Sequence, residues 1–182
     1  MRPSLAPVQV RLASLDDVEG IRAIYNREVL EGTATFDLRP RSPEEQRAWL
    51  TDRDGAHAVV VAVEGPTVLG FGSLSPYRPR PAYRTTVEDS VYVDPAQQGR
   101  GVGRAILEAL VATATQHGFH LVIGRITGHN EASVALHHAC GFETVGVERE
   151  VGRKFSRWLD VVVVQRLLGA PRPPAADGGR RG

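Results

Sequence analysis

One stretch of the chain constrains the fold more than any other: VYVDPAQQGRGVGRAILEALVATATQHGF, residues 91–119. It begins with a short alternating apolar run, continues through three glycines and two arginines, and ends in a long run whose apolar residues recur at helical spacing. This order predicts a strand, a tight turn and a helix. The first backbone N–H groups of a helix have no internal partner and lie at the positive end of its dipole, and glycine lets a phosphate approach the backbone closely. The stretch therefore predicts an anion site at Gly99, Gly101 and Gly103.

The residues of this turn exclude two nucleotide-binding patterns. A Walker A loop needs Gly-Lys-Ser/Thr after a four-residue gap, whereas the chain has Gly103, Arg104 and Ala105, and no hydroxyl is placed to bind Mg²⁺. A dinucleotide fingerprint needs GxGxxG directly after a strand and an acidic residue about 20 positions later. Here the turn reads GxGxG, and the following strand HLVIGRIT ends without an acid. Two interpretations of the turn remain: it binds another phosphate-containing ligand, or its glycines only shape the turn.

Composition limits which binding partners and which cellular compartment we expect. The 182 residues hold 22 Lys and Arg against 21 Asp and Glu, so no overall field attracts nucleic acid or an anionic membrane. The one cysteine, Cys140, excludes an intrachain disulfide and a cysteine zinc cage, and we expect a buried thiol in a reducing compartment. The N-terminus lacks the apolar stretch of a signal peptide, and no segment approaches the roughly 20 apolar residues that span a bilayer. We therefore expect a soluble cytoplasmic protein with no metal, no nucleic-acid partner and no membrane partner.

The rest of the chain alternates between helical and extended patterns. Helices are predicted after the caps Ser14 and Ser42, the second of which has Glu45 in the capping-box position. Strands are predicted at VQVRLA, AVVVAVEGPTVLGFGSL (a hairpin), TVEDSVYV, HLVIGRIT, ETVGVEREVG and WLDVVVVQRLL, and a short helix at NEASVALHHACGF. Because antiparallel pairs mix with at least one crossover, we expect an α/β fold with a central mixed, mostly antiparallel sheet flanked by helices. We expect one domain over residues 1–168 and a disordered tail over residues 169–182.

Two motifs resemble the GNAT superfamily of N-acetyltransferases. QQGRGVGR matches the superfamily's Gln/Arg-x-x-Gly-x-Gly/Ala signature, with Gln98, Gly101 and Gly103 at its fixed positions. About 27 residues later, NEASVALHHACGF is similar to the superfamily's Asn-x-x-(Ala/Ser) helix. The resemblance implies the GNAT fold with acetyl-CoA as co-substrate. It also implies that the backbone amides of the turn hold the pyrophosphate of coenzyme A, which agrees with the anion site expected at a helix N-terminus.

Four sequence blocks resemble one family within this superfamily. TATF, TVEDSVYVDP, ALHHACGF and GRKFSRWLDVVVVQ are similar to blocks of the phosphinothricin and methionine sulfoximine acetyltransferases, over about residues 8 to 168. This implies acetyl transfer from acetyl-CoA to the α-amino group of a small glutamate-like or methionine-like amino acid, by an enzyme that is usually a homodimer. Ala139 and Cys140 stand where the family often has Lys and Leu, so one contact to coenzyme A is expected to be missing.

Two alternative functions stay open. The same fold could acetylate a polyamine, an aminoglycoside or a protein N-terminus, although the arginine-rich loop RPRPAYR disfavours the first two, which are cations. A non-catalytic module that binds acyl-CoA is the other alternative. Loss of both Glu88 and His137 would be its expected mark, and the chain retains both.

Two residues are predicted to move protons. Acetylation of an amine requires a proton acceptor, because a free amine is mostly protonated at pH 7. Alternation along TVEDSVYV places Glu88, Ser90 and Tyr92 on one face and the valines on the other, and the resemblance implies that Glu88 is the catalytic base. The resemblance also implies a catalytic role for His137, whose imidazole passes protons in either direction near neutral pH. His137 and His138 are adjacent on one short helix, so only one points inward, and we expect it to be His137.

The remaining predicted site residues fall into two groups. Contacts with coenzyme A are expected from Val91, Tyr92, Val93, Gln98, Gly99, Arg100, Gly101, Val102, Gly103, Arg104, Asn130 and Ser133. A backbone N–H of Tyr92 or Val93 is expected to meet the developing oxyanion. Contacts with the acceptor are expected from Phe36, Arg78, Arg80, Tyr83, Glu88, Asp89, Ser90 and Lys154. Arginine suits such an acceptor because its planar fork bonds both oxygens of a carboxylate or phosphinate. Lys154, Phe155 and Trp158 are expected to complete the pocket and, in a dimer, to come from the second subunit.

Overall fold

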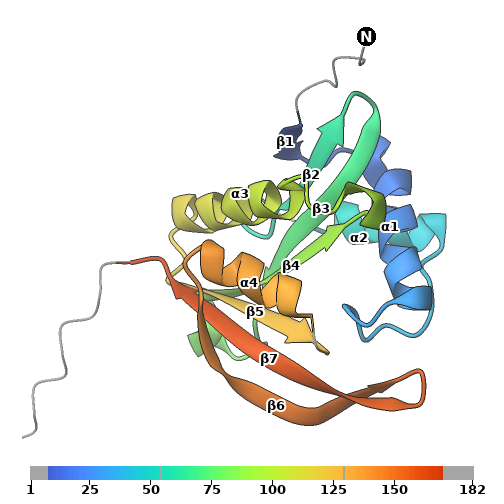
Figure 1. The fold of residues 1–182 in the computed structure, drawn as a ribbon. Helices are drawn as coiled ribbons and strands as arrows, with labels where there is room; N and C mark the ends of the chain where they lie inside the picture. Colours follow the sequence, from blue (N-terminus) through green and yellow to red (C-terminus); the bar gives the residue numbers. More distant parts are fainter. Residues whose placement is uncertain (1–7, 54, 129, 170–182) are drawn as a thin grey trace, which may run out of the picture.

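The computed structural model describes residues 8–53, 55–128 and 130–169. Within this part of the chain, seven strands form one sheet in the order β1-β2-β3-β4-β5-β7-β6 (Figure 1). The strands are β1 (Gln9–Leu12), β2 (Val59–Glu64), β3 (Thr67–Pro76), β4 (Thr86–Val93), β5 (Leu121–Thr127), β6 (Glu143–Lys154) and β7 (Arg157–Leu167). The helices are α1 (Val18–Glu31), α2 (Pro43–Thr51), α3 (Val102–Gln116) and α4 (Glu131–Ala139). Neighbouring strands are antiparallel except β4 and β5, which are parallel and joined by α3.

The predicted order of elements and the mixed, mostly antiparallel sheet are confirmed. The cap of α2 forms as expected: the Ser42 hydroxyl accepts the Glu45 N–H at 3.1 Å, and the Glu45 carboxylate accepts the Ser42 N–H at 2.8 Å. The proline-rich and arginine-rich connector forms only the 3₁₀ turn Pro81–Tyr83. Of the predicted tail, residues 170–182 lie outside the described residues. None of the described helices combines the length and apolar character that crossing a bilayer requires.

Strand β2 shows how the sheet is buried on both faces. Val59, Val61 and Val63 pack with buried residues of α1, whereas Val60 and Ala62 pack with buried residues of α3. Successive strand residues point to opposite faces, so a strand covered on both sides must be apolar throughout. Accordingly, α1 and α2 cover one face of the sheet, and α3 and α4 cover the other (Figure 1).

Strands β4 and β5 separate partway along their length. Their pairing runs from Thr86 opposite Leu121 to Asp89 opposite Gly124. On its other side β4 stays paired with β3 as far as Val93. The second half of β4 therefore has a neighbouring strand on one side only, and this opening positions the candidate site.

The hairpin of β6 and β7 extends beyond the rest of the sheet (Figure 1). Its tip is Phe155–Ser156, where both residues have positive φ, 51° and 60°. A two-residue hairpin turn of type I′ requires positive φ at both central positions. Near the tip, Gly152 leaves room for the Phe36 ring, because a Cβ at position 152 would overlap it. The hairpin thus lies against the connector that follows α1.

Candidate active site

The turn before α3 uses glycine where the backbone demands it. Gly99 and Gly101 have φ of 75° and 81°, in the left-handed region that other residues rarely adopt. Gly101 is the N-cap of α3, and its carbonyl accepts the Ala105 N–H at 3.0 Å. The N–H groups of Val102 and Gly103 precede this first bond and have no partner within the helix. They carry the positive end of the helix dipole and suit an anion.

Gly103 serves a different purpose from the two glycines before it. It lies in the first turn of α3, where a Cβ would stand 3.1 Å from the Leu136 side chain and 3.5 Å from that of Val93. Glycine therefore lets α4 approach the start of α3 and the end of β4 closely. This close approach brings the residues of α4 into the wall of one cavity.

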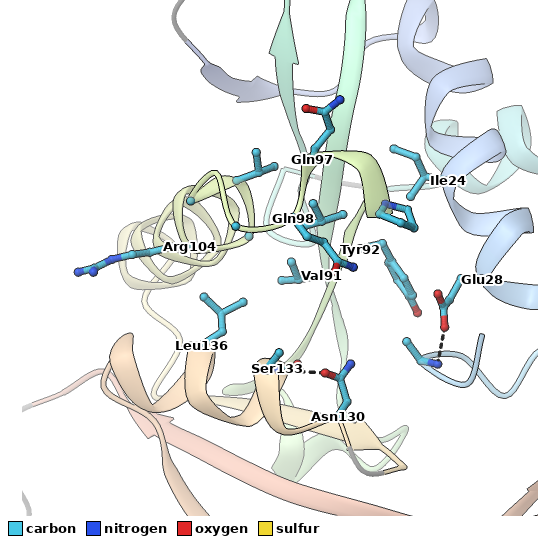
Figure 2. Close-up of a pocket in the computed structure, with 18 of the residues that line it drawn as sticks. Ile24, Glu28, Val91, Tyr92, Gln97, Gln98, Arg104, Asn130, Ser133 and Leu136 are labelled. Atoms are coloured by element: carbon cyan, nitrogen blue, oxygen red, sulfur yellow. Dashed lines mark hydrogen bonds between the residues drawn. The ribbon is translucent and has the colours of Figure 1, made fainter. Parts of the chain in front are cut away.

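A cavity of ≈ 430 Å³ lies between the start of α3, the open half of β4, α1 and α4 (Figure 2). Its lining residues are Ile24, Arg27, Glu28, Ala34, Val91, Tyr92, Val93, Pro95, Gln97, Gln98, Gly99, Gly101, Val102, Gly103, Arg104, Asn130, Ala132, Ser133 and Leu136. Every predicted contact with coenzyme A is among them except Arg100. Arg100 donates a hydrogen bond to the Glu64 carboxylate at the end of β2 at 3.0 Å, and its contact with coenzyme A stays a prediction.

The open edge of β4 presents main-chain groups to the gap. The Asp94 N–H donates to the Leu69 carbonyl of β3 at 2.9 Å, so this residue directs its main chain toward β3. Neighbouring residues of a strand direct their N–H groups to opposite sides. The N–H groups of Val91 and Val93 therefore point toward the gap, and that of Tyr92 points toward β3. Of the two predicted oxyanion donors, this geometry favours Val93.

Glu88 lies on the face of β4 opposite α3, as alternation predicts. It is half-buried beside Val87, which is fully buried on the other face. Burial raises the pKa of the Glu88 carboxyl; Arg125 lowers it, whereas the negative charges of Asp89 and Glu148 raise it further, and the net shift is upward. A carboxylate with a raised pKa is a better proton acceptor at neutral pH.

Arg125 is a site residue that no sequence pattern singles out. Glu88 pairs with Ile123 of β5, and paired residues share a face, so Arg125 two positions later lies on the face that carries Glu88. Its guanidinium donates two hydrogen bonds to the Glu148 carboxylate on β6, at 3.0 and 2.5 Å. Alternation in HLVIGRIT indicates which residues share a face with Arg125, but the register between β4 and β5 cannot be read from the sequence.

Helix α4 points His137 inward and His138 outward. His137 is 3% exposed; its Nε2 lies 3.0 Å from an Asp89 carboxylate oxygen and its Nδ1 lies 2.7 Å from the Ser133 carbonyl oxygen. The His138 ring is exposed and lies 2.9 Å from the Thr144 hydroxyl. The predicted inward orientation of His137 is confirmed. The Asp89 carboxylate lies on the valine face of β4 against His137 and not beside Glu88, and its contact with the acceptor stays a prediction.

The connector between β3 and β4 carries the other predicted acceptor contacts. The Arg78 guanidinium lies 4.9 Å from the centre of the Tyr77 ring and 5.6 Å from that of Tyr83, and the two rings meet edge to face. Arg80 is exposed on the same connector. None of these side chains is among those that line the two cavities beside β4, so their contact with the acceptor stays a prediction.

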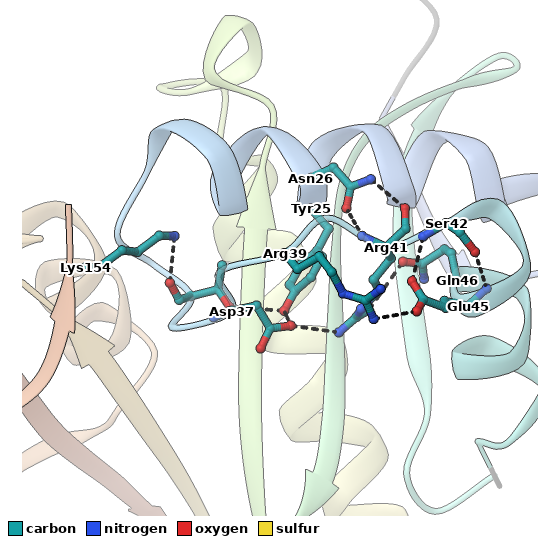
Figure 3. Close-up of polar contacts among 10 residues, drawn as sticks. Tyr25, Asn26, Asp37, Arg39, Arg41, Ser42, Glu45, Gln46 and Lys154 are labelled. Atoms are coloured by element: carbon teal, nitrogen blue, oxygen red, sulfur yellow. Dashed lines mark hydrogen bonds and ion pairs between the residues drawn. The ribbon is translucent and has the colours of Figure 1, made fainter.

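Polar contacts hold the connector between α1 and α2, which carries Phe36 (Figure 3). The Tyr25 hydroxyl donates to the Asp37 carboxylate at 2.5 Å and lies 3.0 Å from the Thr35 hydroxyl. The Arg41 guanidinium lies 3.9 Å from the centre of the Tyr25 ring. These contacts fix the connector against α1 and leave the Phe36 ring partly exposed.

Lys154 ties the hairpin to this connector. Its ammonium group donates to the Glu28 carbonyl at 3.1 Å and to the Thr35 carbonyl at 3.0 Å. Figure 3 shows Lys154 reaching from the hairpin to this connector. The residue is 3% exposed, and burial lowers the pKa of its ammonium group. Lys154 therefore joins two segments of the same chain, and its contact with the acceptor stays a prediction.

The match to a known family agrees with this geometry. Residues 21–142, more than half of the chain, match the Acetyltransferase (GNAT) family, and the chain belongs to this family. The fold, the turn before α3 and the family together define an acyl-CoA-dependent N-acetyltransferase. Among the described residues, no group of three or more His, Cys, Asp or Glu side chains could hold a metal ion.

Named relatives and a solved structure match this chain over nearly its whole length. A phosphinothricin N-acetyltransferase of Streptomyces coelicolor is 42% identical over 91% of this chain and 99% of its own. An L-methionine sulfoximine/L-methionine sulfone acetyltransferase of Pseudomonas aeruginosa is 38% identical over 90% of this chain and 96% of its own. A phosphinothricin acetyltransferase of Sinorhizobium meliloti, solved in complex with acetyl-CoA, is 38% identical and superposes with a TM-score of 0.83 over 94% of each chain.

Proposed function

We propose that this protein transfers an acetyl group from acetyl-CoA to the α-amino group of a small glutamate-like or methionine-like amino acid, such as phosphinothricin or methionine sulfoximine. One observation carries the proposal. The separation of β4 from β5 after Asp89 opens the sheet between an anion-binding helix start and the half-buried Glu88. The names of the relatives support the choice of acceptor.

Glu88 acts as the general base in this proposal. An amino group attacks a thioester only after it loses a proton, and the raised pKa of Glu88 suits it to accept that proton directly or through one water molecule. The open N–H groups of Val91 and Val93 are the candidates for binding the oxyanion that develops on the thioester carbonyl. His137 then supplies a proton to the departing thiolate.

The acceptor's acidic groups need cations on the side of the sheet that carries Glu88. Arg125 is the first candidate, since it shares this face and already forms a two-bond pair with one carboxylate, Glu148. A second carboxylate approaching Arg125 would compete with Glu148 for the same guanidinium. Arg78 and Arg80 remain candidates for the acceptor's distal anionic group, which a planar guanidinium binds through two oxygens.

The acceptor assignment is tested by following thiol release from acetyl-CoA with four acceptors: phosphinothricin, methionine sulfoximine, spermidine and a short peptide. We expect kcat/KM for one of the first two to exceed that for the last two by on the order of 100-fold or more, because a site built around ionic groups rejects ligands that leave them unpaired. Thiol release with only spermidine or the peptide would refute the proposed acceptor class, although the protein would still be an acetyltransferase.

We also propose that the protein works as a homodimer in the cytoplasm. Several apolar side chains of β6 and β7 are exposed in the single chain: Val145, Val147, Val151, Phe155 and Trp158. Covering them with a second subunit would remove apolar surface from water. The buried thiol of Cys140 suits a reducing compartment. Light scattering should give twice the mass of the chain, and a single-chain mass at micromolar concentration would contradict the dimer.

A further inference from the structure

Asp89 and His137 form a buried pair with a third polar contact. The His137 side chain is 4% exposed and that of Asp89 is 1% exposed. The imidazole Nε2 lies 3.0 Å from Oδ2 of Asp89, and Nδ1 lies 2.7 Å from the Ser133 carbonyl oxygen, one turn earlier on α4. The Phe142 ring meets the imidazole edge to face with centres 5.0 Å apart. These contacts fix the orientation of the imidazole ring.

The two hydrogen bonds determine how many protons the pair holds. A carbonyl oxygen only accepts, so Nδ1 of His137 must carry a hydrogen to bond with Ser133. In a neutral imidazole Nε2 would then be an acceptor, and a carboxylate is an acceptor too. A bond between Nε2 and Asp89 therefore needs one more proton, placed either on the ring or on the carboxyl. In both arrangements the pair carries one proton beyond a neutral histidine and a carboxylate.

Gly124 makes this close approach possible. It pairs with Asp89, and these are the last paired residues before β4 and β5 separate. A Cβ at position 124 would lie 3.0 Å from Nε2 of His137 and 3.1 Å from Oδ1 of Asp89. Any larger residue would push the two groups apart. The pair is therefore built at the point where the sheet opens.

The pair borders a second, smaller cavity beside the first. This cavity of ≈ 60 Å³ is lined by Asp89 and His137 together with Ala34, Ser90, Val91, Tyr92, Arg125, Ile126, Thr127, Asn130 and Ser133. Five of these residues also line the larger cavity: Ala34, Val91, Tyr92, Asn130 and Ser133. The volume and the polar lining suffice to hold a water molecule. Within the described residues, Oδ1 of Asp89 has no hydrogen-bond partner. The second cavity thus links the pair to the wall of the larger one.

We propose that Asp89 is a positioning residue that loads His137 with a transferable proton, which passes through the small cavity to the thiolate of coenzyme A. This inference rests on the proposed acetyl transfer. When the carbon–sulfur bond breaks, the sulfur leaves with the bonding electrons and takes the pair's shared proton. His137 keeps the Nδ1 hydrogen and Asp89 is left as a carboxylate. The attacking amine gives up two protons: one when the ammonium ion becomes the free amine, and one as the amide forms. One proton from solvent returns to the pair of Asp89 and His137. Each turnover therefore releases one proton in total.

The surroundings of the pair support this role. Burial lowers the pKa of His137, but the hydrogen bond and charge of Asp89 and the bond to Ser133 outweigh it and raise the pKa overall. Other charged and titratable groups nearby are Arg125 at the second cavity, Cys140 at the C-cap of α4 and Arg166, which donates to the Cys140 carbonyl. Glu88 lies on the opposite face of β4. The anion that bonds directly to His137 is Asp89 alone among the described residues.

The test uses the full chain and the variant Asp89→Asn. An asparagine amide donates a hydrogen bond to Nε2 of a neutral His137, so the geometry is kept while the extra proton is removed. Asp160→Asn is the control, because the Asp160 carboxylate accepts the Glu150 N–H on the hairpin and Asp160 lines neither cavity beside β4. We expect Asp89→Asn to lower kcat about 10- to 100-fold at pH 8 with little change in the KM for acetyl-CoA. Its loss of kcat at high pH should begin at a lower pH than in the wild type, because His137 keeps its proton to a higher pH beside Asp89. The control should match the wild type.

Nuclear magnetic resonance of the imidazole nitrogens provides a readout that does not depend on catalysis. In the wild type, His137 should lose its extra proton above the ordinary value of 6.5, and in Asp89→Asn below that pH. Two outcomes would overturn the proposal: wild-type His137 titrating at or below pH 6.5, or an Asp89→Asn variant whose kcat falls equally at every pH. The wild-type titration decides the matter even if the variant fails to fold. An absence of thiol release from the wild type would refute the proposed function and leave this titration to test the pair.

Discussion

The two sides of the site offer different chemical groups to their ligands, main-chain groups on one side and side chains on the other. The coenzyme side consists mainly of one contiguous stretch, β4 and the turn into α3, and it offers main-chain N–H groups to its ligand. The proposed acceptor side consists of side chains from three separate segments, Phe36, Glu88 and Arg125, and Arg125 is paired with Glu148 of a fourth segment. Main-chain geometry follows from local sequence, whereas a set of side chains from distant segments depends on strand register. We therefore expect the coenzyme side to tolerate changes in its side chains better than the acceptor side does.

The strongest test of this contrast is the variant Glu88→Gln. It keeps the shape of the acceptor side but removes the proton acceptor, and we expect kcat/KM to fall about 10²- to 10⁴-fold. Burial raises the pKa of Glu88, so its proton-accepting form appears only at a higher pH than for an ordinary glutamate. Wild-type kcat/KM should therefore rise with pH across a limb that lies above pH 4.5, the ordinary value. That limb should disappear in the variant, and a full kcat/KM in the variant at every pH would remove Glu88 as the base.

A second test asks whether Arg125 belongs to the acceptor side. In Arg125→Gln we expect the KM for the amino acid to rise about 10-fold, since a hydrogen bond between charged groups contributes roughly 1.5 to 3 kcal/mol. The positive charge that lowers the pKa of Glu88 is also lost, so the acid limb of kcat/KM should move to higher pH. Arg149→Gln, an exposed arginine on β6, is the control and should change neither quantity. An unchanged acceptor KM in Arg125→Gln would exclude the residue from the site.

A third test concerns the main chain of the coenzyme side and compares two glycines. Gly101 and Gly65 both have positive φ, 81° and 58°, and a Cβ at either position would meet no atom within 4 Å. Alanine at each should cost about 1 to 2 kcal/mol of backbone strain. We expect Gly101→Ala to raise the KM for acetyl-CoA about fivefold with little change in kcat, because it disturbs binding alone. Gly65→Ala, in the hairpin turn, should lower the melting temperature similarly and leave this KM unchanged. Equal KM values in the two variants would contradict the role of Gly101.

The same contrast explains what could be predicted from the sequence. The strand, turn and helix around Gly99 and Gly101 were predictable, because φ preference and helix capping act over a few residues. Alternation predicted that Glu88 leaves the valine face, and helical spacing predicted that only one of His137 and His138 points inward. The coarse fold was predictable for the same reason, since apolar periodicity is a local property.

The remaining site residues depend on contacts between distant segments. Asp89 was expected to contact the acceptor, whereas its bond to His137 depends on a residue 48 positions later in the chain. The face shared by Arg125 and Glu88 depends on the register of two parallel strands. Lys154 was expected to complete the acceptor pocket because it lies in a block that resembles the family's, and no motif records the main-chain carbonyls that are its partners in the structure.

The short pairing between β4 and β5 also divides the sheet into two halves that few residue pairs join. Residues 9–93 form β1 to β4 and carry Glu88, whereas residues 121–167 form β5, β6 and β7 and carry Arg125 and His137. Within the described part of the chain, four residue pairs, Thr86 to Asp89 with Leu121 to Gly124, join the two halves of the sheet. A cut at the turn after α3, near Gly118, would give two fragments that each hold half of the proton-transfer chemistry. Acetyl transfer by the mixture would then report reassembly, which makes this fold a natural starting point for a split-enzyme sensor.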